Sequence, residues 1–470
     1  MANVILLTVD CFRYDRCGFN GHDRNTTPTL DALANEAVVF DNAYSTGPYT
    51  TESFPGIIAG QHSYNGSYYS DSPAWKAIQP DSETLATHLK GEGYSTVATL
   101  TNPHLISDRN FHQGFDSFYN LRTQDQGEQV AADDVDDDKE SAKMESLESA
   151  VRERMRSFST VFNPYSAMFV AHRYSQLRTD WPTISAEDVL SQFMDDLVDV
   201  DGPFFGWTHL MDLHAPISPD RTNKGGLAST SSTLRQILWD SARASNIHEA
   251  RYNTLYDSVL RYVDTKIAEL IDALKQQGRW EDTILIVTGD HGEALYDRGF
   301  YGHPRHNLHE EAVHVPLLVR APSLEGKRIE TEFSLAWIHD LISELLNVES
   351  GDFPSTSDVT WFAESEPNPP VVVSDSLDGS RHTVGVRDGE SVVITHQGEQ
   401  PSEPHFQYYD QPVKYRYRGD RRERVPARAQ DGVLLEEAKS LLTEPSQLEE
   451  VGGSFSPEVE RRLEDLGYKM

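Results

Sequence analysis

Carboxylate and imidazole side chains gather at three places in this sequence, and each place directly follows a short apolar run. In chain order these side chains are Asp10 in TVDCFRYD, His209, Asp212 and His214 in HLMDLHAP, and Asp290, His291 and His303 in VTGDHGEALYDRGFYGH. Oxygen and imidazole ligands from distant parts of a chain are the combination that binds a divalent metal ion. Any one of these groups could simply cap the element after its strand, but three together indicate a shared metal site.

The stretch Gly47–Gly60, GPYTTESFPGIIAG, places hydroxyl side chains at the start of an expected helix. A hydroxyl at neutral pH is a poor nucleophile unless a metal ion lowers its pKa or a base takes its proton. A helix N-terminus favours the negative charge that would then develop. We take Thr50 as the candidate nucleophile, with Thr51 and Ser53 as close rivals. The ordinary alternative is a threonine that only caps the helix.

Short apolar runs with the pattern of strands buried on both faces of a parallel sheet must position these groups. They span residues 4–9, 94–101, 204–210, 283–288 and 315–319, and helical periodicity covers residues 29–40, 81–93, 185–198, 250–277 and 334–346. Alternating strands and helices predict an α/β fold with a doubly wound, mainly parallel sheet. Ligands bind such sheets beyond the carboxyl ends of the strands, where the three polar sets lie.

The pattern changes after about residue 370 to shorter alternating segments such as HTVGVRDGESVVITH. We therefore expect a catalytic α/β domain over residues 1–369 and a smaller C-terminal α+β subdomain over 370–470. The subdomain should contain an antiparallel sheet and a helix near Pro457–Leu466. An acidic stretch rich in Ala and Glu predicts a helical insertion at about 124–200 in the first domain.

The charge balance is strongly acidic, with 41 Lys and Arg against 75 Asp and Glu and a formal net charge of -34. Such a chain is a poor partner for nucleic acid or for anionic lipid. Acidic residues spread along the whole chain, with Arg preferred to Lys, are typical of a salt-adapted, haloarchaeal protein. An ordinary acidic protein is the alternative interpretation.

The cellular location follows from three further observations. No apolar run reaches the ~18 residues that a membrane span needs, so we expect no stable membrane insertion. The opening MANVILLTVD lacks the basic flank and cleavage site of a signal peptide and predicts a first buried strand. Cys11 and Cys17, the two cysteines, lie too close together for a useful disulfide, which favours a reducing compartment. We therefore expect a cytoplasmic protein.

Several longer motifs resemble, in the right order, those of the sulfatase family within the alkaline phosphatase superfamily. They are NVILLTVDCFRYDRCGFNG, TTPTLDALANEAVVFDNAY, FPGIIAGQHSYNG, GFDSFY, HLMDLHAP, TGDHGEALYDRGFYGH and LHEEAVHVPLLVRAP. The resemblance covers residues 2–345 apart from the insertion. It implies an alkaline-phosphatase-like fold, a divalent metal ion and chemistry on a sulfate or phosphate ester.

The sequence departs from the family at the nucleophile. Sulfatases mature a cysteine in the pattern Cys-x-Pro-Ser-Arg into the formylglycine that attacks sulfur. The resemblance places Thr50 on that cysteine, Glu52 on the proline and Phe54 on the arginine. A threonine cannot become formylglycine, but a threonine nucleophile at this place is standard in relatives that cleave phosphodiesters or move phosphoryl groups.

Other departures concern the metal and the anion. Cys11 stands where the family places a second Asp, and it is either a bystander or a soft ligand. Asn102 and His303 stand where the family has lysines that bind the substrate. Two cations that would contact the anion are thus replaced by neutral or weakly basic groups.

The resemblance and the residue chemistry together assign roles to individual positions. The assigned residues are Asp10, Thr50, Asp290 and His291 for one divalent metal ion, Thr50, His214 and His303 for catalysis, and His104 and Arg13 for substrate binding. Calcium, magnesium or manganese suits this ligand set, and zinc also fits. A salt bridge with Asp15 is an equal alternative for Arg13, and a second metal ion would need His209 and Asp212, which are more often structural.

These assignments predict a metal-dependent hydrolase or transferase that acts on sulfate or phosphate esters, with Thr50 attacking in line. The substrate would be a small anionic ester, carried by a sugar or a lipid. One alternative is a catalytically degenerate relative that binds a metal ion or an anionic ligand. Another is a phosphotransferase that modifies surface glycans or lipids. The sequence does not indicate an oligomeric state.

Overall fold

The arrangement of the chain is described from a computed structural model. The described residues are 1–69, 72–124, 181–229, 249–299, 301–359, 371–379, 381–399, 412–416, 427–428 and 432–451, with 459, 460 and 463. Statements about the fold below refer to this part of the chain.

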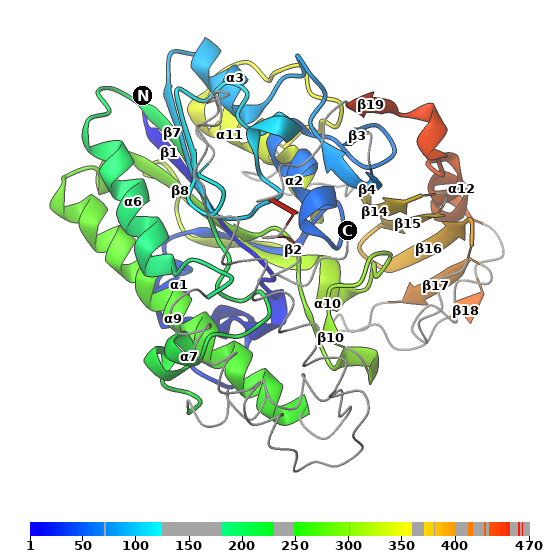
Figure 1. Ribbon diagram of the computed structural model, residues 1–470, viewed down its shortest axis with the longest axis horizontal. Helices are drawn as coiled ribbons and strands as arrows, with labels where there is room; N and C mark the ends of the chain where they lie inside the picture. Colours follow the sequence, from blue (N-terminus) through cyan, green and yellow to red (C-terminus); the bar gives the residue numbers. More distant parts are fainter. Residues whose placement is uncertain are drawn as a thin grey trace, which may run out of the picture.

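A mixed, mostly parallel sheet forms the centre of the molecule (Figure 1). Its parallel strands, in the spatial order β8–β1–β7–β5–β6, are β1 (Asn3–Val9), β5 (Ser95–Leu100), β6 (Ser117–Asn120), β7 (Phe204–Leu210) and β8 (Thr283–Gly289). Beyond β8, β11 (His314–Arg320) runs antiparallel to both β8 and β2 (Val38–Tyr44). Two short strands, β12 (Lys327–Ile329) and β13 (Phe333–Ser334), pair with β2. The predicted α/β fold class is confirmed.

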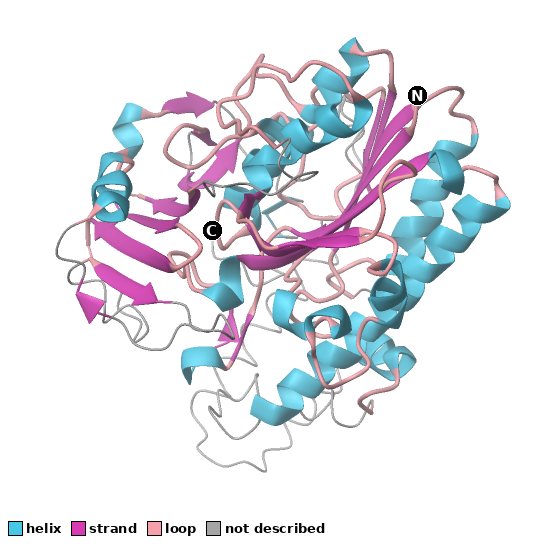
Figure 2. Cartoon of the chain, turned by 180° about the vertical axis from the view of Figure 1, so that it is seen from behind, coloured by secondary structure: helices cyan, strands magenta, loops and turns pink. Residues whose placement is uncertain are grey.

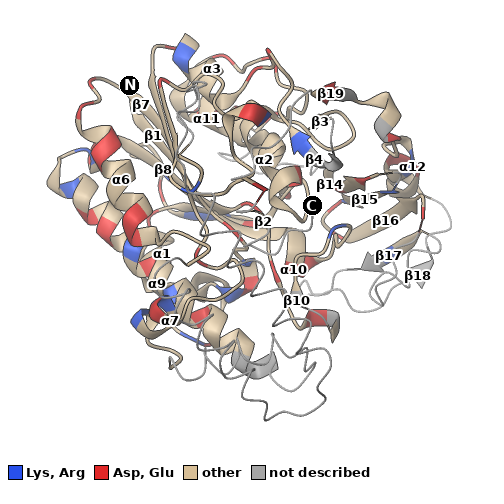
Figure 3. Cartoon of the chain, viewed as in Figure 1, with Lys and Arg blue, Asp and Glu red and all other residues tan. Residues whose placement is uncertain are grey.

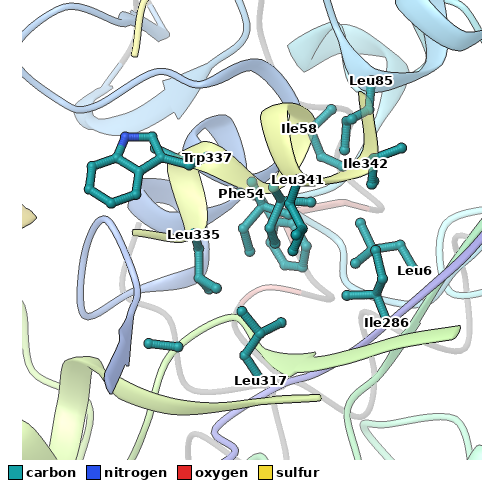
Figure 4. Close-up of a cluster of buried hydrophobic side chains, with 14 of the residues drawn as sticks. Leu6, Phe54, Ile58, Leu85, Ile286, Leu317, Leu335, Trp337, Leu341 and Ile342 are labelled. Carbon is teal, nitrogen blue, oxygen red and sulfur yellow. The ribbon is translucent and has the colours of Figure 1, made fainter. Parts of the chain in front are cut away.

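Helices cover both faces of this sheet, because alternate strand residues point to opposite sides. One face carries α2 (Thr50–Ala59), α3 (Leu85–Gly91) and α11 (Ile338–Leu346), and the other carries α1 (Pro28–Leu33), α6 (Ala186–Val198) and α9 (Glu249–Gln276), as Figure 2 shows from behind. Leu6 and Ile286 pack beneath the first group, together with Phe54 (Figure 4). Ile5 and Leu7 pack beneath the second. Two apolar cores therefore lie on opposite faces of the large sheet.

Two expected helices are shorter than their sequence patterns suggested. The pattern at 29–40 predicted one helix, but α1 ends at Leu33 and the β-branched run from Val38 joins β2. Pro28 occupies the first turn of α1, where its fixed φ suits a helix start. In the stretch 81–93, α3 begins only after Thr84, whose hydroxyl and backbone exchange hydrogen bonds with those of Thr87 as a reciprocal cap.

The C-terminal part forms a separate antiparallel sheet, as predicted, and a helix that was not predicted packs on it (Figure 1). Its elements are β14 (Val372–Asp378), β15 (Arg381–Arg387), β16 (Ser391–Gln397), β17 (Val413–Arg416), β18 (Ala427–Arg428) and α12 (Val433–Ser440). The helix expected near Pro457–Leu466 lies largely outside the described residues. A third small sheet joins β4 (Ser72–Ala77), β3 (Ser67–Tyr69) and β19 (Glu449–Val451), which brings the C-terminal part back onto the first domain. A boundary at residue 370 stays a prediction.

The expected insertion at 124–200 is described only in part, since residues 125–180 lie outside the described ranges. Its last part, α6, packs against the sheet through Val189, Phe193 and Leu197. Ser185 caps this helix by accepting a hydrogen bond from the Asp188 N–H at 3.2 Å. Acidic side chains are frequent along α6 and α9 (Figure 3). Among the described helices, none is both long enough and apolar enough to cross a bilayer.

Candidate active site and metal centre

Three neighbouring strands bring the first polar groups together. Asp10 follows β1 and Asp290 follows β8, and each continues the sheet ladder, with Asp10 N–H bonded to Leu210 O at 2.8 Å and Asp290 N–H to Val9 O at 3.3 Å. His209 lies near the end of β7, on the other side of β1. One ligand atom from each of Asp10, His209 and Asp290 lies within 4.8 Å of the others, and all three residues are completely buried. The sheet topology therefore builds a compact set of two carboxylates and one imidazole.

This set has the chemistry of a cation site. His209 Nδ1 donates to Thr8 Oγ1 at 3.0 Å, because the Thr8 hydroxyl already donates its proton to the Thr208 carbonyl. The lone pair on His209 Nε2 then faces Asp10 Oδ2 at 3.7 Å. Neither His209 Nε2 nor Asp290 Oδ2 has a hydrogen-bond partner among the described residues. Buried polar atoms without partners are costly, so this donor set fits a divalent metal ion.

The protonation of the two carboxyls supports the same interpretation. Burial, followed by the negative charge of Asp10, raises the pKa of Asp290 to about 8. For Asp10, burial acts in the same direction but is outweighed by His209, His214 and His291, which lower its pKa well below the usual range. Two buried carboxyl groups this close cannot both ionise without a compensating cation.

Thr50 lies at the N-terminus of α2 and is completely buried beside this set. Its Oγ1 lies 3.2 Å from His291 Nε2 and 3.5 Å from Asn102 Nδ2. His291 Nδ1 donates to the Gly292 carbonyl at 2.8 Å, and burial, together with His303, lowers the His291 pKa to about 4. The neutral ring therefore presents the lone pair of Nε2 to the Thr50 hydroxyl, which donates to it.

The four predicted metal ligands converge on one place. His291 Nε2 lies 3.7 Å from Asp10 Oδ1 and 3.5 Å from Asp290 Oδ2, and Thr50 completes the group. The rival hydroxyls differ: Thr51 Oγ1 is 3.4 Å from Arg305 Nη2, and Ser53 Oγ has no hydrogen-bond partner among the described residues. Of these three hydroxyls, Thr50 is thus the one in contact with a metal-ligand candidate, His291.

The two remaining catalytic candidates also lie at this place. The His303 ring centroid is 4.7 Å from that of His291 and 5.2 Å from that of His214. His303 Nδ1 lies 3.0 Å from Glu293 Oε2, and although burial opposes it, this carboxylate raises the His303 pKa. His214 Nδ1 donates to the Ala215 carbonyl at 2.6 Å, and burial lowers its pKa. A neutral His214 with its lone pair on Nε2 is better suited to accept a proton than to donate one.

The substrate-binding candidates have different surroundings. His104 is buried, and its Nδ1 accepts from Arg109 Nη1 at 3.1 Å. Burial and the Arg109 charge lower the His104 pKa well below its usual value. Arg13 is held by Asp15 at 2.7 Å and by Asp297, and it also donates to the Glu293 carbonyl. These contacts of Arg13 correspond to the salt-bridge alternative.

Two residues that were not among the predicted site residues lie at this site. His209, treated in the sequence analysis as more often structural, is part of the carboxylate set, and its ring meets that of Phe54 edge-on at 4.8 Å. Arg305 lies 4.2 Å above the Tyr49 ring, next to the nucleophile candidate. A basic residue two positions after His303, in a histidine-rich loop, was the available indication for Arg305. Asp212, by contrast, pairs with Arg221 at 3.2 Å and accepts from Ala186 N–H, as its structural interpretation predicted.

Comparisons with known proteins give a consistent picture. The family model described as Sulfatase matches residues 2–348. An arylsulfatase from Clostridium perfringens is 22% identical over 399 residues, which is 75% of this chain and 76% of the relative. An N-acetylglucosamine-6-O-sulfatase from Bacteroides thetaiotaomicron is 22% identical over 361 residues, 68% of this chain and 63% of that relative.

Solved structures share the fold. A phosphonate monoester hydrolase of Agrobacterium radiobacter gives a TM-score of 0.60 at 18% identity, with coverage of 88% of this chain and 89% of the other. A protein whose structure was solved in complex with its substrate D-glucosamine-2-N,6-O-disulfate gives a TM-score of 0.58 at 17% identity. The match covers 88% of this chain and 91% of the other.

Proposed function

The chain belongs to the sulfatase family, and from this premise we propose that it hydrolyses anionic esters with Thr50 as the nucleophile, phosphate esters in preference to sulfate esters. One observation carries the proposal. The Thr50 hydroxyl lies at a helix N-terminus, 3.2 Å from the lone pair of His291 Nε2 and next to a buried set of metal-ligand candidates. A nucleophile requires a partner for its proton and positive potential for the developing charge, and both are present here.

Each step of the proposed reaction is assigned to particular residues of this chain. The proton of Thr50 is directed at His291, which leaves an oxygen lone pair for in-line attack on the ester. The new bond joins Thr50 Oγ1 to phosphorus or sulfur, and the bond to the leaving oxygen breaks. His214, neutral and with Nε2 as an acceptor, is suited to take a proton from the water that then hydrolyses the intermediate. Asp10, Asp290 and His209 would hold a divalent cation, which when bound lowers the pKa of an oxygen nucleophile and screens the charge of the ester.

Arg305 and the imidazole of His303 would bind the anion, since the lysines expected by resemblance are replaced. The preference for phosphate rests on Thr50, because a threonine cannot provide the aldehyde hydrate that releases sulfate. A sulfate ester is the second candidate, favoured by the named sulfatases among the relatives. We place the ester on a sugar, as in the relative that acts on N-acetylglucosamine sulfate.

Purified protein supplied with divalent metal ions, nitrophenyl phosphate, a phosphodiester and nitrophenyl sulfate tests the proposal. Replacement Thr50→Ala should lower kcat at least ~100-fold, as expected when a nucleophile is removed. Ser53→Ala, which removes a hydroxyl about one helical turn further along, should leave kcat within about twofold of the wild-type value.

Undiminished turnover by Thr50→Ala would eliminate the Thr50 mechanism. Wild-type protein that binds metal but turns over none of the three esters would instead favour a non-catalytic binding role, and a requirement for an acceptor alcohol would favour a transferase.

A further inference from the structure

Ser376 of β14 connects the C-terminal sheet to two parts of the candidate active site. Its Oγ accepts a hydrogen bond from the His306 N–H at 3.0 Å and donates one to Glu52 Oε1 at 2.8 Å. His306 directly follows Arg305 in its loop, and Glu52 lies in the first turn of α2. Given the anion-binding role that the proposed function assigns to Arg305, we propose that Ser376 is a positioning residue, which holds Arg305 where its guanidinium binds the anion.

A single carboxyl oxygen joins Ser376 to Arg305. Glu52 Oε1 accepts from the Ser376 hydroxyl and, at 3.1 Å, from Arg305 Nη1. The side chains of Ser376 and Glu52 are buried, and 15% of the Arg305 side chain is exposed. A guanidinium is a rigid fork on a flexible stem, so its direction depends on partners that are themselves held in place. An Arg305 that is ordered before the anion arrives loses less entropy on binding.

The backbone that follows Arg305 is held by the same sheet. His306 has φ of 66°, a left-handed conformation that is uncommon for a residue with a side chain. Its N–H donates to Ser376 on β14, and its Nδ1 lies 3.0 Å from Thr383 Oγ1 on β15. Because this turn directly follows Arg305, it determines the direction in which that side chain leaves the backbone. Loss of the Ser376 hydroxyl would therefore remove one partner from the turn and one from Glu52.

The same strand also fixes the segment that leads into α2. The Asp375 N–H donates to the Thr46 carbonyl at 2.7 Å. A Cβ built on Gly47 would lie 2.6 Å from Glu52 Cβ and 2.8 Å from the Asp375 carbonyl oxygen, so this close approach requires glycine. One strand therefore holds both parts of the proposed anion site, the start of α2 and the loop that contains Arg305.

Ser374 provides a matched comparison on the same strand. It is also completely buried, and its Oγ donates to the Ser45 carbonyl at 2.6 Å and accepts from Arg387 Nη1 at 3.4 Å. These two contacts lie before α2 and within the C-terminal sheet. Neither serine carries a charge, so the removal of either hydroxyl leaves the formal charge of the site unchanged. A role in positioning Arg305 therefore distinguishes the two serines.

Calorimetric titration of inorganic phosphate into the full-length chain, supplied with Mg²⁺, tests this role without requiring turnover. Ser376→Ala should raise the Kd for phosphate about fivefold, because a hydrogen bond that orders Arg305 is lost. Arg305→Ala should raise the Kd about tenfold. The double variant should also reach only about tenfold, because Ser376 acts through Arg305. Ser374→Ala should stay within about twofold of the wild-type value, and circular dichroism checks that each variant is folded.

Turnover of an ester provides a second readout. Ser376→Ala should raise KM about fivefold and leave kcat within about twofold, since the Thr50–His291 pair is intact. A loss of kcat with an unchanged KM would contradict a role in anion binding. Ser376→Cys keeps nearly the same side-chain size but replaces the hydroxyl by a weakly hydrogen-bonding thiol. It should behave like Ser376→Ala, and it takes the place of that variant in the titrations if Ser376→Ala does not fold.

A phosphate Kd of Ser376→Ala equal to the wild-type value would overturn the positioning role. So would a double variant weakened about fiftyfold, which is the product of two independent effects, or wild-type protein that binds no phosphate. Failure of the proposed function has a different signature. Thr50→Ala would keep its turnover, or no ester would be hydrolysed, while the phosphate Kd values would still show that Ser376 acts through Arg305.

Discussion

Arg305 lies against the residues on both sides of Thr50. Its guanidinium is 4.2 Å above the Tyr49 ring, and it donates to Thr51 Oγ1 at 3.4 Å and to Glu52 Oε1 at 3.1 Å. Burial raises the pKa of Glu52 to about 7, although Arg305 and Lys76 act against it. Glu52 can therefore be neutral near pH 7, which leaves the charge of Arg305 available to an anion.

Replacement Arg305→Ala should raise KM for anionic esters about tenfold, because one charge-assisted contact of ~1.4 kcal/mol is lost. Its effect on kcat should stay within about threefold, since the Thr50–His291 pair is intact. Steady-state kinetics measure both constants. Arg328→Ala is the control, because that arginine pairs with Asp41 elsewhere on the surface. An unchanged KM for Arg305→Ala would exclude an anion-binding role.

The residues of the site differ in how readily the sequence predicted them. Asp10 and Asp290 were predictable because each directly follows an apolar strand pattern. His209 was considered only as a ligand of a second metal ion and otherwise as structural, although strand alternation points to it. Phe205 and Trp207 pack on the face of α2, and the next residue of that phase is His209. Arg305 depends on how a loop folds back over α2, and no local periodicity predicts such a contact.

The helices of one face depend on a close approach between α7 (Pro219–Gly225) and α9. A Cβ built on Gly225 would lie 1.6 Å from the Ser258 backbone oxygen, a distance that neither helix can tolerate without moving. Ser258 Oγ also donates to the Thr222 carbonyl at 2.7 Å. The glycine is therefore what allows the two helices to pack this closely.

We predict that Gly225→Ala lowers the free energy of unfolding by about 3 kcal/mol, because overpacking of this kind forces a backbone shift. Urea unfolding followed by circular dichroism provides the measurement. Gly91→Ala is the matched control at the end of α3, where an added Cβ meets nothing within 4 Å, and it should change stability by less than about 1 kcal/mol. Equal stabilities of the two variants would contradict the packing argument.

At the level of elements, strand positions were more predictable than their directions. The run at 315–319 was correctly recognised as a strand, but β11 runs antiparallel to β8, and a fully buried strand has the same apolar pattern in either direction. The helix predicted over 29–40 was too long, because its last residues are apolar in a way that suits a helix and a strand equally. Tertiary pairing of Val38 with Val319 decides the outcome.

The two parts of the whole molecule meet at Asp375, which is completely buried in β14. Its carboxylate lies 3.0 Å from His382 Nε2, accepts from Ser63 N–H at 3.2 Å and lies 3.7 Å from His62 Nδ1. Its backbone N–H donates to the Thr46 carbonyl at 2.7 Å. Burial opposes ionisation, but His382 and His62 hold the Asp375 pKa far below its usual value. This residue therefore attaches the C-terminal sheet to the segment that leads into α2.

A depressed pKa stabilises the fold only while the carboxyl is ionised. The contribution of Asp375 is complete above the ~3.9 of an unfolded aspartate and is lost as the pH falls toward its folded value. We predict that Asp375→Asn lowers the free energy of unfolding at pH 7 by about 3 kcal/mol. Thermal unfolding between pH 6 and pH 3 should show a steeper fall of Tm below pH 4 in the wild type than in the variant. Parallel Tm curves would contradict this role.

The charge of the whole molecule contrasts with that of its site. Acidic residues exceed basic ones by 34, and acidic segments are frequent along the outer helices (Figure 3). The buried centre, by contrast, combines two carboxyls with imidazoles and is suited to a divalent cation. Composition predicted the acidic surface but not this centre, because burial and strand order determine the local balance. An anionic substrate would therefore be held by groups within the site and not by long-range attraction.

The covalent intermediate at Thr50 is the most direct test of the central claim. Rapid acid quench of the wild-type enzyme with a phosphate ester, followed by peptide mass spectrometry, would locate any transferred group. The account predicts one phosphoryl group on Thr50 in the peptide that contains Gly47–Gly60, and none in Thr50→Ala. Turnover without any adduct at Thr50, or an adduct on Thr51 or Ser53 instead, would contradict it.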